Sequence, residues 1–477
     1  MRVTIPPEAS GQTLADYLRS RGYFLSQPCG GNGTCGKCRV KTEDGTELLA
    51  CRTLCPPEGI TVAFDDVRVD EAEPYTLSSG RRGIALDVGT TTLALAAVEL
   101  PSCRILATRT ALNPQAAFGA DVITRIGQSA AHGKEMQTVL LDAIRTLGEG
   151  FFPAEEMVVA GNPTMLALFA GVSPEPMGRA PFTPAFIDRL TLRGDALALP
   201  VGTVHLLPGA SAFVGADVLA GIARTKMLSA DAPSLLLDLG TNGEMALYVP
   251  ERGTLTVTSA AAGPALEGAN ISCGIGGVSG AVCRVDSRNG RFTYETVDDA
   301  PARGLCGSGL IDLVACLLDE ALLDETGALT KAPFVLKGVH KTKHGDVPDQ
   351  APVLTLTQQD IRELQLAKSA VRAGLEVLLR DAALTVRDVK HVYLAGGMGT
   401  FIRGGSAARI GLLPDEFLPR LSAVGNTALA GAADALRDPA LLDGIAARAK
   451  TLTLNDAPRF AELFVEHMTF PTEDSPV

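Results

Sequence analysis

Four cysteines near the N-terminus constrain this chain more than any other feature. Cys29, Cys35, Cys38 and Cys51 follow the spacing C-x5-C-x2-C-x12-C, and the segment 29–38 also holds four glycines. Glycine lets a backbone close tightly around a bound group, and four thiolates suit iron–sulfur clusters or zinc. The long first gap favours a [2Fe–2S] cluster over a zinc ribbon, which uses two short C-x2-C pairs. The pattern therefore predicts a one-electron redox centre.

Two alternatives stay open at this motif. Zinc binding and disulfide pairing are the competing uses of the four thiols. Cys55 follows Cys51 by four residues and is the reserve candidate for the fourth ligand. We take Cys51 as the ligand, because its distance from the loop is typical of compact ferredoxin-like domains.

Charge and hydropathy exclude several classes of partner. The 477 residues have a net charge of −12 with no block of like charges, which argues against binding a nucleic-acid polyanion. The N-terminal residues contain no apolar stretch of a secretory signal, and no uncharged apolar run reaches the ~18 residues of a membrane span. We therefore expect a cytoplasmic protein. Six further cysteines lack pairing motifs, as is typical of proteins in the reducing cytosol: Cys55, Cys103, Cys273, Cys283, Cys306 and Cys316.

The chain divides into parts of different pattern. Residues 1–66 predict a small α+β domain of the β-grasp type, with strands at 3–5, 39–42 and 60–64 and a helix at 13–18. Residues 67–82 read as a linker. From residue 83 onward, apolar strands alternate with helical stretches, which indicates an α/β fold. We predict a first half at 83–230 and a second half with a C-terminal tail at 231–477.

An internal repeat supports that division. An apolar strand ending in Asp87-Val-Gly89-Thr90-Thr91 is echoed by one ending in Asp238-Leu-Gly240-Thr241-Asn242-Gly243, and a second apolar strand follows each. Glycine allows close backbone approach, and the amides and hydroxyls after it form an anion-binding nest. The aspartate of each copy suits Mg²⁺ held through water. One such turn would be unremarkable, but two in matching contexts predict a phosphate-binding cleft.

A third element lies near the C-terminus. Residues 360–382 predict a helix with apolar residues at a spacing of three and four, and residues 389–394 predict a strand that runs into Gly396-Gly397. A glycine pair at the end of a strand lets a flat ring lie against bare backbone, at the edge where open α/β sheets bind ligands.

Together these three elements resemble the phosphate-1, phosphate-2 and adenosine motifs of the acetate and sugar kinase/Hsp70/actin (ASKHA) superfamily. With the cysteine motif added, the chain resembles reductive activators of corrinoid-dependent methyltransferase systems. Further stretches that resemble this family are Asn113–Gln115, Gly119–Asp121, Gly161–Met165, Gly215–Asp217, Gly263–Gly274 and Cys306–Gly309. Better-known members carry an additional domain after the ferredoxin domain, where this chain has only some 16 residues, so it resembles a short form.

The resemblance implies a β-grasp ferredoxin domain followed by a duplicated, actin-like (ribonuclease H-like) ATPase domain. It implies ATP-coupled, one-electron reduction of Co(II) to Co(I) in a corrinoid protein, with a [2Fe–2S] cluster, ATP and Mg²⁺ as cofactors. Its other implied partners are a low-potential electron donor and, by analogy, a second copy of the chain. In the roles that the resemblance implies, Cys29, Cys35, Cys38 and Cys51 hold the cluster, and Asp87 and Asp238 bind Mg²⁺ and orient water. The implied nucleotide contacts are Gly89, Thr90, Thr91, Gly240, Thr241, Asn242, Gly243, Gly396 and Gly397.

Helper roles and competing functions complete the expectations. Asp217, Glu244 and Glu267 are candidate helpers, for which buried or capping roles weigh equally. The rival functions are an ATP-coupled electron donor to a different metalloenzyme, a small-molecule kinase, and a redox sensor whose nucleotide cleft only sets conformation.

Overall fold

The computed structural model describes residues 2–21, 25, 33, 38–64, 80–343, 345–348, 354–396 and 402–472. The elements group into two compact units, Met1–Leu207 and Pro208–Val477. Within the described ranges, every helix is too short or too polar to cross a bilayer.

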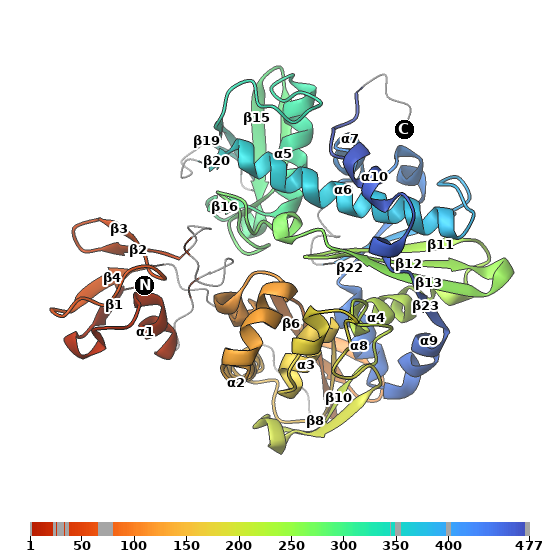
Figure 1. Ribbon diagram of the computed structural model, residues 1–477, viewed down its shortest axis with the longest axis horizontal. Coiled ribbons are helices and arrows are strands. Elements are labelled where there is room, and N and C mark those ends of the chain that lie inside the picture. Colours follow the sequence, from red (N-terminus) through yellow and green to blue (C-terminus); the bar gives the residue numbers. More distant parts are fainter. Residues whose placement is uncertain are drawn as a thin grey trace. The chain divides into compact units, whose positions relative to one another are not determined.

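The N-terminal part of the first unit is a small antiparallel sheet with one helix (Figure 1). The strand order is β1–β4–β2–β3, and each pairing is antiparallel. Apolar side chains from the strands and the helix share one core. The predicted strands and helix are confirmed to within two residues by β1 (Arg2–Ile5), α1 (Leu14–Ser20), β2 (Arg39–Thr42) and β4 (Ile60–Ala63), and β3 (Glu47–Leu49) is a further strand that was not predicted.

The rest of the first unit is a six-stranded sheet in the order β7–β6–β5–β8–β10–β9. The first three strands form an antiparallel meander, and β8 and β10 run parallel to β5. The inner strands are buried over almost their whole length, as expected when both faces of a sheet are covered. The elements are β5 (Arg82–Val88), β6 (Thr92–Glu99), β7 (Arg104–Leu112), α2 (Val122–Leu147), β8 (Ala154–Gly161), α3 (Pro163–Ala170), β9 (Leu190–Arg193) and β10 (Val201–Leu206).

The second unit repeats this arrangement. Its main sheet has the order β22–β21–β11–β12–β13–β23, with an antiparallel meander from β11 to β13 and β21 parallel to β11. In both sheets the third, second, first and fourth strands in chain order therefore lie side by side in that order, and a further parallel strand lies next to the fourth, which confirms the predicted duplication. The strands are β11 (Ser234–Leu239), β12 (Gly243–Val249), β13 (Thr254–Ala260), β21 (His391–Ala395), β22 (Leu421–Gly425) and β23 (Ala449–Thr451).

A five-stranded sheet, which the sequence patterns did not predict, is inserted between β13 and β21. It has the order β16–β14–β15–β18–β19 and is accompanied by a two-stranded sheet of β17 and β20. Figure 1 shows it beside α5 and one end of α6. The elements are β14 (Ala281–Arg288), β15 (Arg291–Thr296), β16 (Gly304–Leu305), α5 (Gly307–Asp319), β17 (Phe334–Leu336), β18 (Gly338–Thr342), β19 (Gly345–Pro348) and β20 (Leu354–Leu356).

The long helix α6 (Gln358–Asp381) confirms the helix predicted at 360–382. Thr357 and Asp360 form a capping box at its start, which satisfies the free amides of the first turn. The apolar positions that predicted it are all buried: Ile361, Leu364, Ala367, Val371, Leu375 and Leu378. The remaining helices of the second unit are α4 (Ala216–Thr225), α7 (Gly404–Arg409), α8 (Thr427–Ala435), α9 (Asp443–Arg448) and α10 (Phe460–Glu466).

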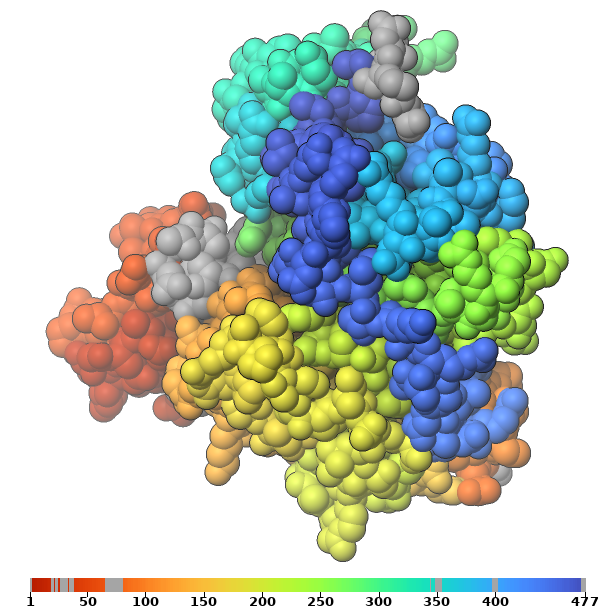
Figure 2. Space-filling view, turned by 45° about the vertical axis from the view of Figure 1, so that its right-hand side comes forward, coloured from red at the N-terminus to blue at the C-terminus, as the bar shows by residue number. Residues whose placement is uncertain are grey.

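The end of the chain is fastened to α6. The buried Lys368 ammonium donates to the carbonyls of His467 (2.5 Å) and Thr469 (2.6 Å). Figure 2 shows this last stretch, in dark blue, lying over the cyan helix. The C-terminal segment is thus part of the second unit's packed structure.

Candidate functional site: a thiol group and two phosphate-loop hairpins

The ferredoxin-like domain places two of the four predicted cluster ligands. Cys38 immediately precedes β2, and Cys51 follows β3. Both thiols are buried, and the Ala50 amide donates to the Cys38 carbonyl (2.9 Å), so the backbone beside Cys51 is tied to that of Cys38. Two sulfurs from adjacent segments fit a four-thiolate cluster. Cys29 and Cys35 lie outside the described residues.

Cys55 occupies a different environment. Its thiol is buried, and its amide donates to the Gln12 carbonyl (2.8 Å), which places it next to the start of α1. Burial raises the pKa of the Cys55 thiol, and the nearby Asp16 carboxylate raises it further. Because a metal ligand must be a thiolate, this environment favours a core role for Cys55.

The first hairpin loop, residues 89–91, joins β5 to β6. A Cβ on Gly89 would lie 2.5 Å from the Thr92 carbonyl oxygen, so the turn closes only with glycine there. Thr90 is buried, and its hydroxyl accepts a hydrogen bond from Asn162 (3.0 Å). Asp87 is half-buried on β5 and Thr91 is half-buried in the loop. The predicted residues Asp87, Gly89, Thr90 and Thr91 are therefore neighbours at the end of one strand.

Buried donors hold the backbone of this loop. The side-chain amide of Asn113 donates to the Gly89 carbonyl (2.8 Å), and the backbone N–H of Asn113 donates to the Thr91 carbonyl (2.7 Å). Arg125, from α2, donates to the Thr90 carbonyl (2.6 Å). Both side chains are almost fully buried. Asn113 lies in a stretch that resembles the family, whereas no sequence motif predicted Arg125. One signal in the sequence could have found Arg125. It is the fourth residue of α2, where the helix dipole disfavours a cation, and an unfavourable position of this kind indicates a specific role.

The second hairpin loop, residues 240–242, joins β11 to β12. The Gly240 amide donates to the Asn242 carbonyl (3.0 Å), which closes a tight turn. A Cβ on Gly243 would lie 2.7 Å from the Val371 side chain on α6, so glycine permits that helix to approach the hairpin. The buried Thr241 hydroxyl donates to the Glu267 carboxylate. Glu267, a candidate helper in the sequence, thus contacts the loop directly.

Carboxyl groups gather around the second loop. Burial raises the pKa of Glu244 well above its ordinary range, and the charges of Asp217 and Asp238 raise it further, against an opposing hydrogen bond from Asn242. Burial also raises the pKa of Asp217 to about 6, although the Val218 amide donates to it. Both neighbouring charges therefore disfavour ionisation of Glu244. Among the residues that the structure describes, no group of three or more acidic, histidine or cysteine side chains is placed to hold a metal ion directly.

The adenosine element meets the same loop. Gly396 follows β21 with φ +102°, and a Cβ there would lie 2.7 Å from the Asp238 carboxylate and 2.8 Å from the Leu239 carbonyl. Only glycine fits this contact. The second unit therefore brings Asp238, Thr241, Asn242 and Gly396 together, whereas Gly397 lies outside the described residues.

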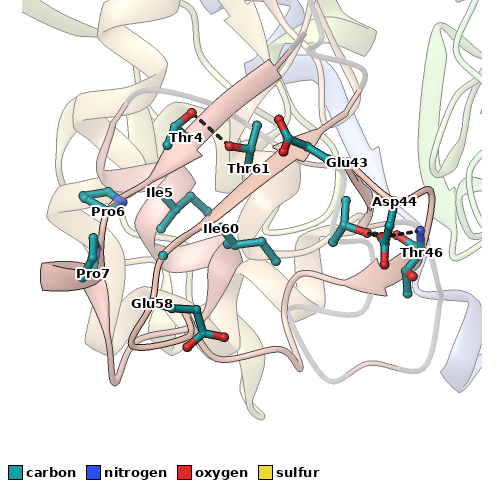
Figure 3. Close-up of a pocket in the computed structure, with 12 residues that line it drawn as sticks. Thr4, Ile5, Pro6, Pro7, Glu43, Asp44, Thr46, Glu58, Ile60 and Thr61 are labelled. Carbon is teal, nitrogen blue, oxygen red and sulfur yellow. Dashed lines mark hydrogen bonds between the residues drawn. The ribbon is translucent and has the colours of Figure 1, made fainter.

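A surface hollow of about 740 Å³ lies elsewhere, on the ferredoxin-like domain (Figure 3). Its rim includes Glu43, Asp44 and Glu58, beside Thr4 and Thr61. Among the described residues, no cysteine and no hairpin-loop residue lines it. The hollow is therefore separate from Cys38 and Cys51.

Comparison with known proteins gives matches along the chain. A family model described as the C-terminal domain of RACo, the ASKHA domain, matches residues 232–477. One of the RACo middle region matches residues 82–230, and one of the 2Fe-2S iron–sulfur cluster binding domain matches residues 2–57.

Two curated relatives and one solved structure match most of the chain. Corrinoid activation enzyme RamQ of Eubacterium limosum is 32% identical over 424 residues, covering 81% of this chain and 70% of the relative. The [Co(II) methylated amine-specific corrinoid protein] reductase of Methanosarcina barkeri is 26% identical over 410 residues, covering 78% and 73%. A solved structure, the reductive activator for corrinoid,iron-sulfur protein, superposes with a TM-score of 0.75 at 26% identity, covering 99% of this chain and 97% of the other.

Proposed function

The chain belongs to the RACo family, and from this premise we propose that it reductively activates a corrinoid protein. It passes one electron to Co(II) in a partner corrinoid protein to give Co(I), and couples the transfer to ATP hydrolysis. The observation that carries the proposal is the fusion, in one chain, of a cysteine-bearing ferredoxin domain to a duplicated hairpin fold with two phosphate-type loops.

The ferredoxin domain accounts for the electron. Cys29, Cys35, Cys38 and Cys51 would hold a [2Fe–2S] cluster, which supplies a single low-potential electron when bound. Cys38 and Cys51 are buried in the domain core, which limits solvent access to bound iron. An uphill transfer to cobalt explains why such a domain is fused to a nucleotide-binding one. A low-potential donor in the cytoplasm would supply the ferredoxin domain in turn.

The hairpin loops account for the nucleotide. Backbone amides and hydroxyls bind phosphates, and the glycines allow close approach. Mg²⁺ would be held by Asp87 and Asp238, largely through water, and would neutralise phosphate charge. Gly396 and Gly397 would flank the adenosine. The phosphate contacts come from Gly89, Thr90, Thr91, Gly240, Thr241, Asn242 and Gly243.

The test is an anaerobic assay with the full chain. The protein is reduced, mixed with a candidate Co(II) corrinoid protein, and followed through the Co(I) absorption band with and without ATP. We expect Co(I) only when ATP is present, and a loss of the signal with Asp238→Ala. Equal Co(I) formation without ATP would overturn the coupling.

A pair of cysteine variants tests the redox half separately. Cys51→Ser should lose iron and visible absorption, because it removes a ligand. Cys55→Ser is the matched control, since Cys55 is a buried thiol four residues away, and should keep both. The reverse result would transfer the ligand role to Cys55, and a colourless, iron-free wild type after reconstitution would end the redox proposal.

A further inference from the structure

The geometry around the first hairpin loop points to a positioning residue for phosphate binding. We propose that Arg125 fixes the loop so that its amides face a bound phosphate, and that its charge favours the anion there. The inference rests on the proposed ATP-binding function and goes beyond it, because Arg125 lies on α2, outside the loop and both strands of the hairpin.

The argument starts from the planar peptide. The C=O and N–H of one peptide unit point in nearly opposite directions. Arg125 holds the Thr90 carbonyl toward the core (2.6 Å), so the Thr91 N–H, which belongs to the same unit, points the other way. Asn113 does the same to the Gly89 carbonyl (2.8 Å) and therefore to the Thr90 N–H. Two successive amides are thus aimed to one side, which is the arrangement of an anion-binding nest.

Arg125 is itself rigidly held. Its Nε donates to the Gly119 carbonyl (2.9 Å), and its remaining amino group lies 3.2 Å from the Met165 sulfur. The side chain is 0% exposed. A buried cation is costly to desolvate, and in low-dielectric surroundings its field acts strongly on nearby charge. Only one peptide unit separates this cation from the outward face of the loop, so a phosphate there experiences a favourable potential.

A purely structural role of Arg125 predicts a different pattern of binding losses. Arg125 also links α2 to the Gly119 turn, so its loss could simply loosen the first unit. Loosening would weaken ADP binding in any variant that loosens the first unit, whether or not the altered residue contacts the loop. The positioning role predicts a loss confined to residues that contact the loop and to ligands that carry phosphate. Adenosine and ADP, which share the adenosine moiety and differ in the diphosphate, test the dependence on phosphate.

The experiment measures ADP and adenosine binding by calorimetry on the full-length protein. Arg125→Met should weaken ADP binding about tenfold or more, which is ~1.4 kcal/mol, and leave adenosine within twofold. Arg125→Lys keeps the charge without the fixed fork of donors, so its ADP affinity should lie between those of the wild type and Arg125→Met. Arg109→Met is the matched control in the same unit: Arg109 also donates to backbone carbonyls, including that of Leu147 (3.0 Å), but does not contact the loop. It should leave both affinities unchanged.

A second variant covers the case in which Arg125→Met does not fold. Asn113→Ser retains a good helix-capping oxygen for the Gln115 amide but cannot reach the Gly89 carbonyl, so it should give the same selective loss of ADP. Parallel loss of ADP and adenosine, or no loss of either, would overturn the inference and leave the proposed function intact. A wild type that binds ADP no better than adenosine would overturn the proposed function itself.

Discussion

The two hairpin loops share a sequence pattern and a strand arrangement but stand in opposite electrostatic surroundings. The first loop is held by hydrogen-bond donors: Asn113, Arg125 and Asn162 all direct N–H groups at its carbonyls or hydroxyl. The second loop is surrounded by acceptors, since Glu267 accepts from Thr241 while the charges of Asp217 and Asp238 act on Glu244. The same strand–turn–strand backbone thus occurs twice in the chain with different neighbours.

This difference suggests a division of labour within the proposed ATP site. Donors behind a loop favour an anion in front of it, so the first loop suits phosphate. Carboxyls around a loop favour a cation, so the second loop suits Mg²⁺. A sequence repeat therefore need not mean a repeated role, and variants that treat the two loops alike can test the division.

The largest expected effect is on catalysis. Asp238→Ala should lower ATP hydrolysis roughly 100-fold, ~2.7 kcal/mol in activation free energy, and should raise the Mg²⁺ concentration needed. Asp87→Ala, in the first loop, should cost about tenfold, because its surroundings bind anions. Asp231→Asn is the control, as its side chain is 96% exposed. Steady-state hydrolysis against Mg²⁺ measures all three, and a larger loss with Asp87→Ala would reverse the assignment.

The glycines that begin the loops provide a matched structural pair. A Cβ on Gly89 would meet the Thr92 carbonyl at 2.5 Å, whereas on Gly240 the nearest atom, of Glu267, would be 3.7 Å away. Gly89→Ala should therefore destabilise its hairpin by about 2 kcal/mol, and Gly240→Ala by less than about 1 kcal/mol. Denaturant unfolding of the two variants checks this, and equal losses would show that the loops are equally tight.

Much of the fold was predictable because its signals are local. The strand–turn–strand repeat, the α6 periodicity and the ferredoxin-like strands each rest on neighbouring residues, and the structure has them. The inserted sheet was missed, since only its β14–β15 hairpin is local and its other pairings join segments further apart in the chain. β15 pairs in parallel with β18, more than forty residues further on.

The site was predictable in its loops but not in what surrounds them. Asp87 and Gly89 were found by pattern, whereas Arg125 contacts a carbonyl 35 residues away and carries no motif. Asp217, Glu244 and Glu267 were named as helpers, but only three-dimensional packing places their carboxyls near the second loop. Cys51 stays the predicted fourth ligand, and the burial of Cys55 beside the Asp16 charge likewise could not be read from the sequence.

A smaller effect concerns pH. A carboxyl whose pKa rises on folding binds its proton more tightly in the folded state. Its contribution to folded-state stability is therefore complete below the unfolded pKa and is lost as the pH rises through the folded pKa. For Asp217 the window runs from 3.8 to about 6. In the absence of Mg²⁺, the amides of β11 and β12 should lose about 2 kcal/mol of protection against hydrogen exchange as the pH rises through this window. The amides of β5 and β6 should keep their protection.

Hydrogen exchange, corrected for intrinsic rates, measures that protection at pH 4 and pH 7. Asp217→Asn removes the titrating group and should flatten the dependence in the second hairpin. An equal pH response in both hairpins would contradict the electrostatic difference between the loops.

The smallest effect is expected at Glu244. Since burial and neighbouring charge raise the pKa of Glu244 well above the ordinary range, the neutral carboxyl is favoured, and glutamine is its close isostere. Glu244→Gln should change the stability of the metal-free protein by less than about 0.5 kcal/mol, whereas Glu244→Ala leaves a cavity beside buried polar groups and should cost more. Thermal unfolding compares the two. A tenfold fall in Mg²⁺ affinity for Glu244→Gln would show instead that Glu244 ionises and joins Asp238, which would make the second loop still more acidic relative to the first.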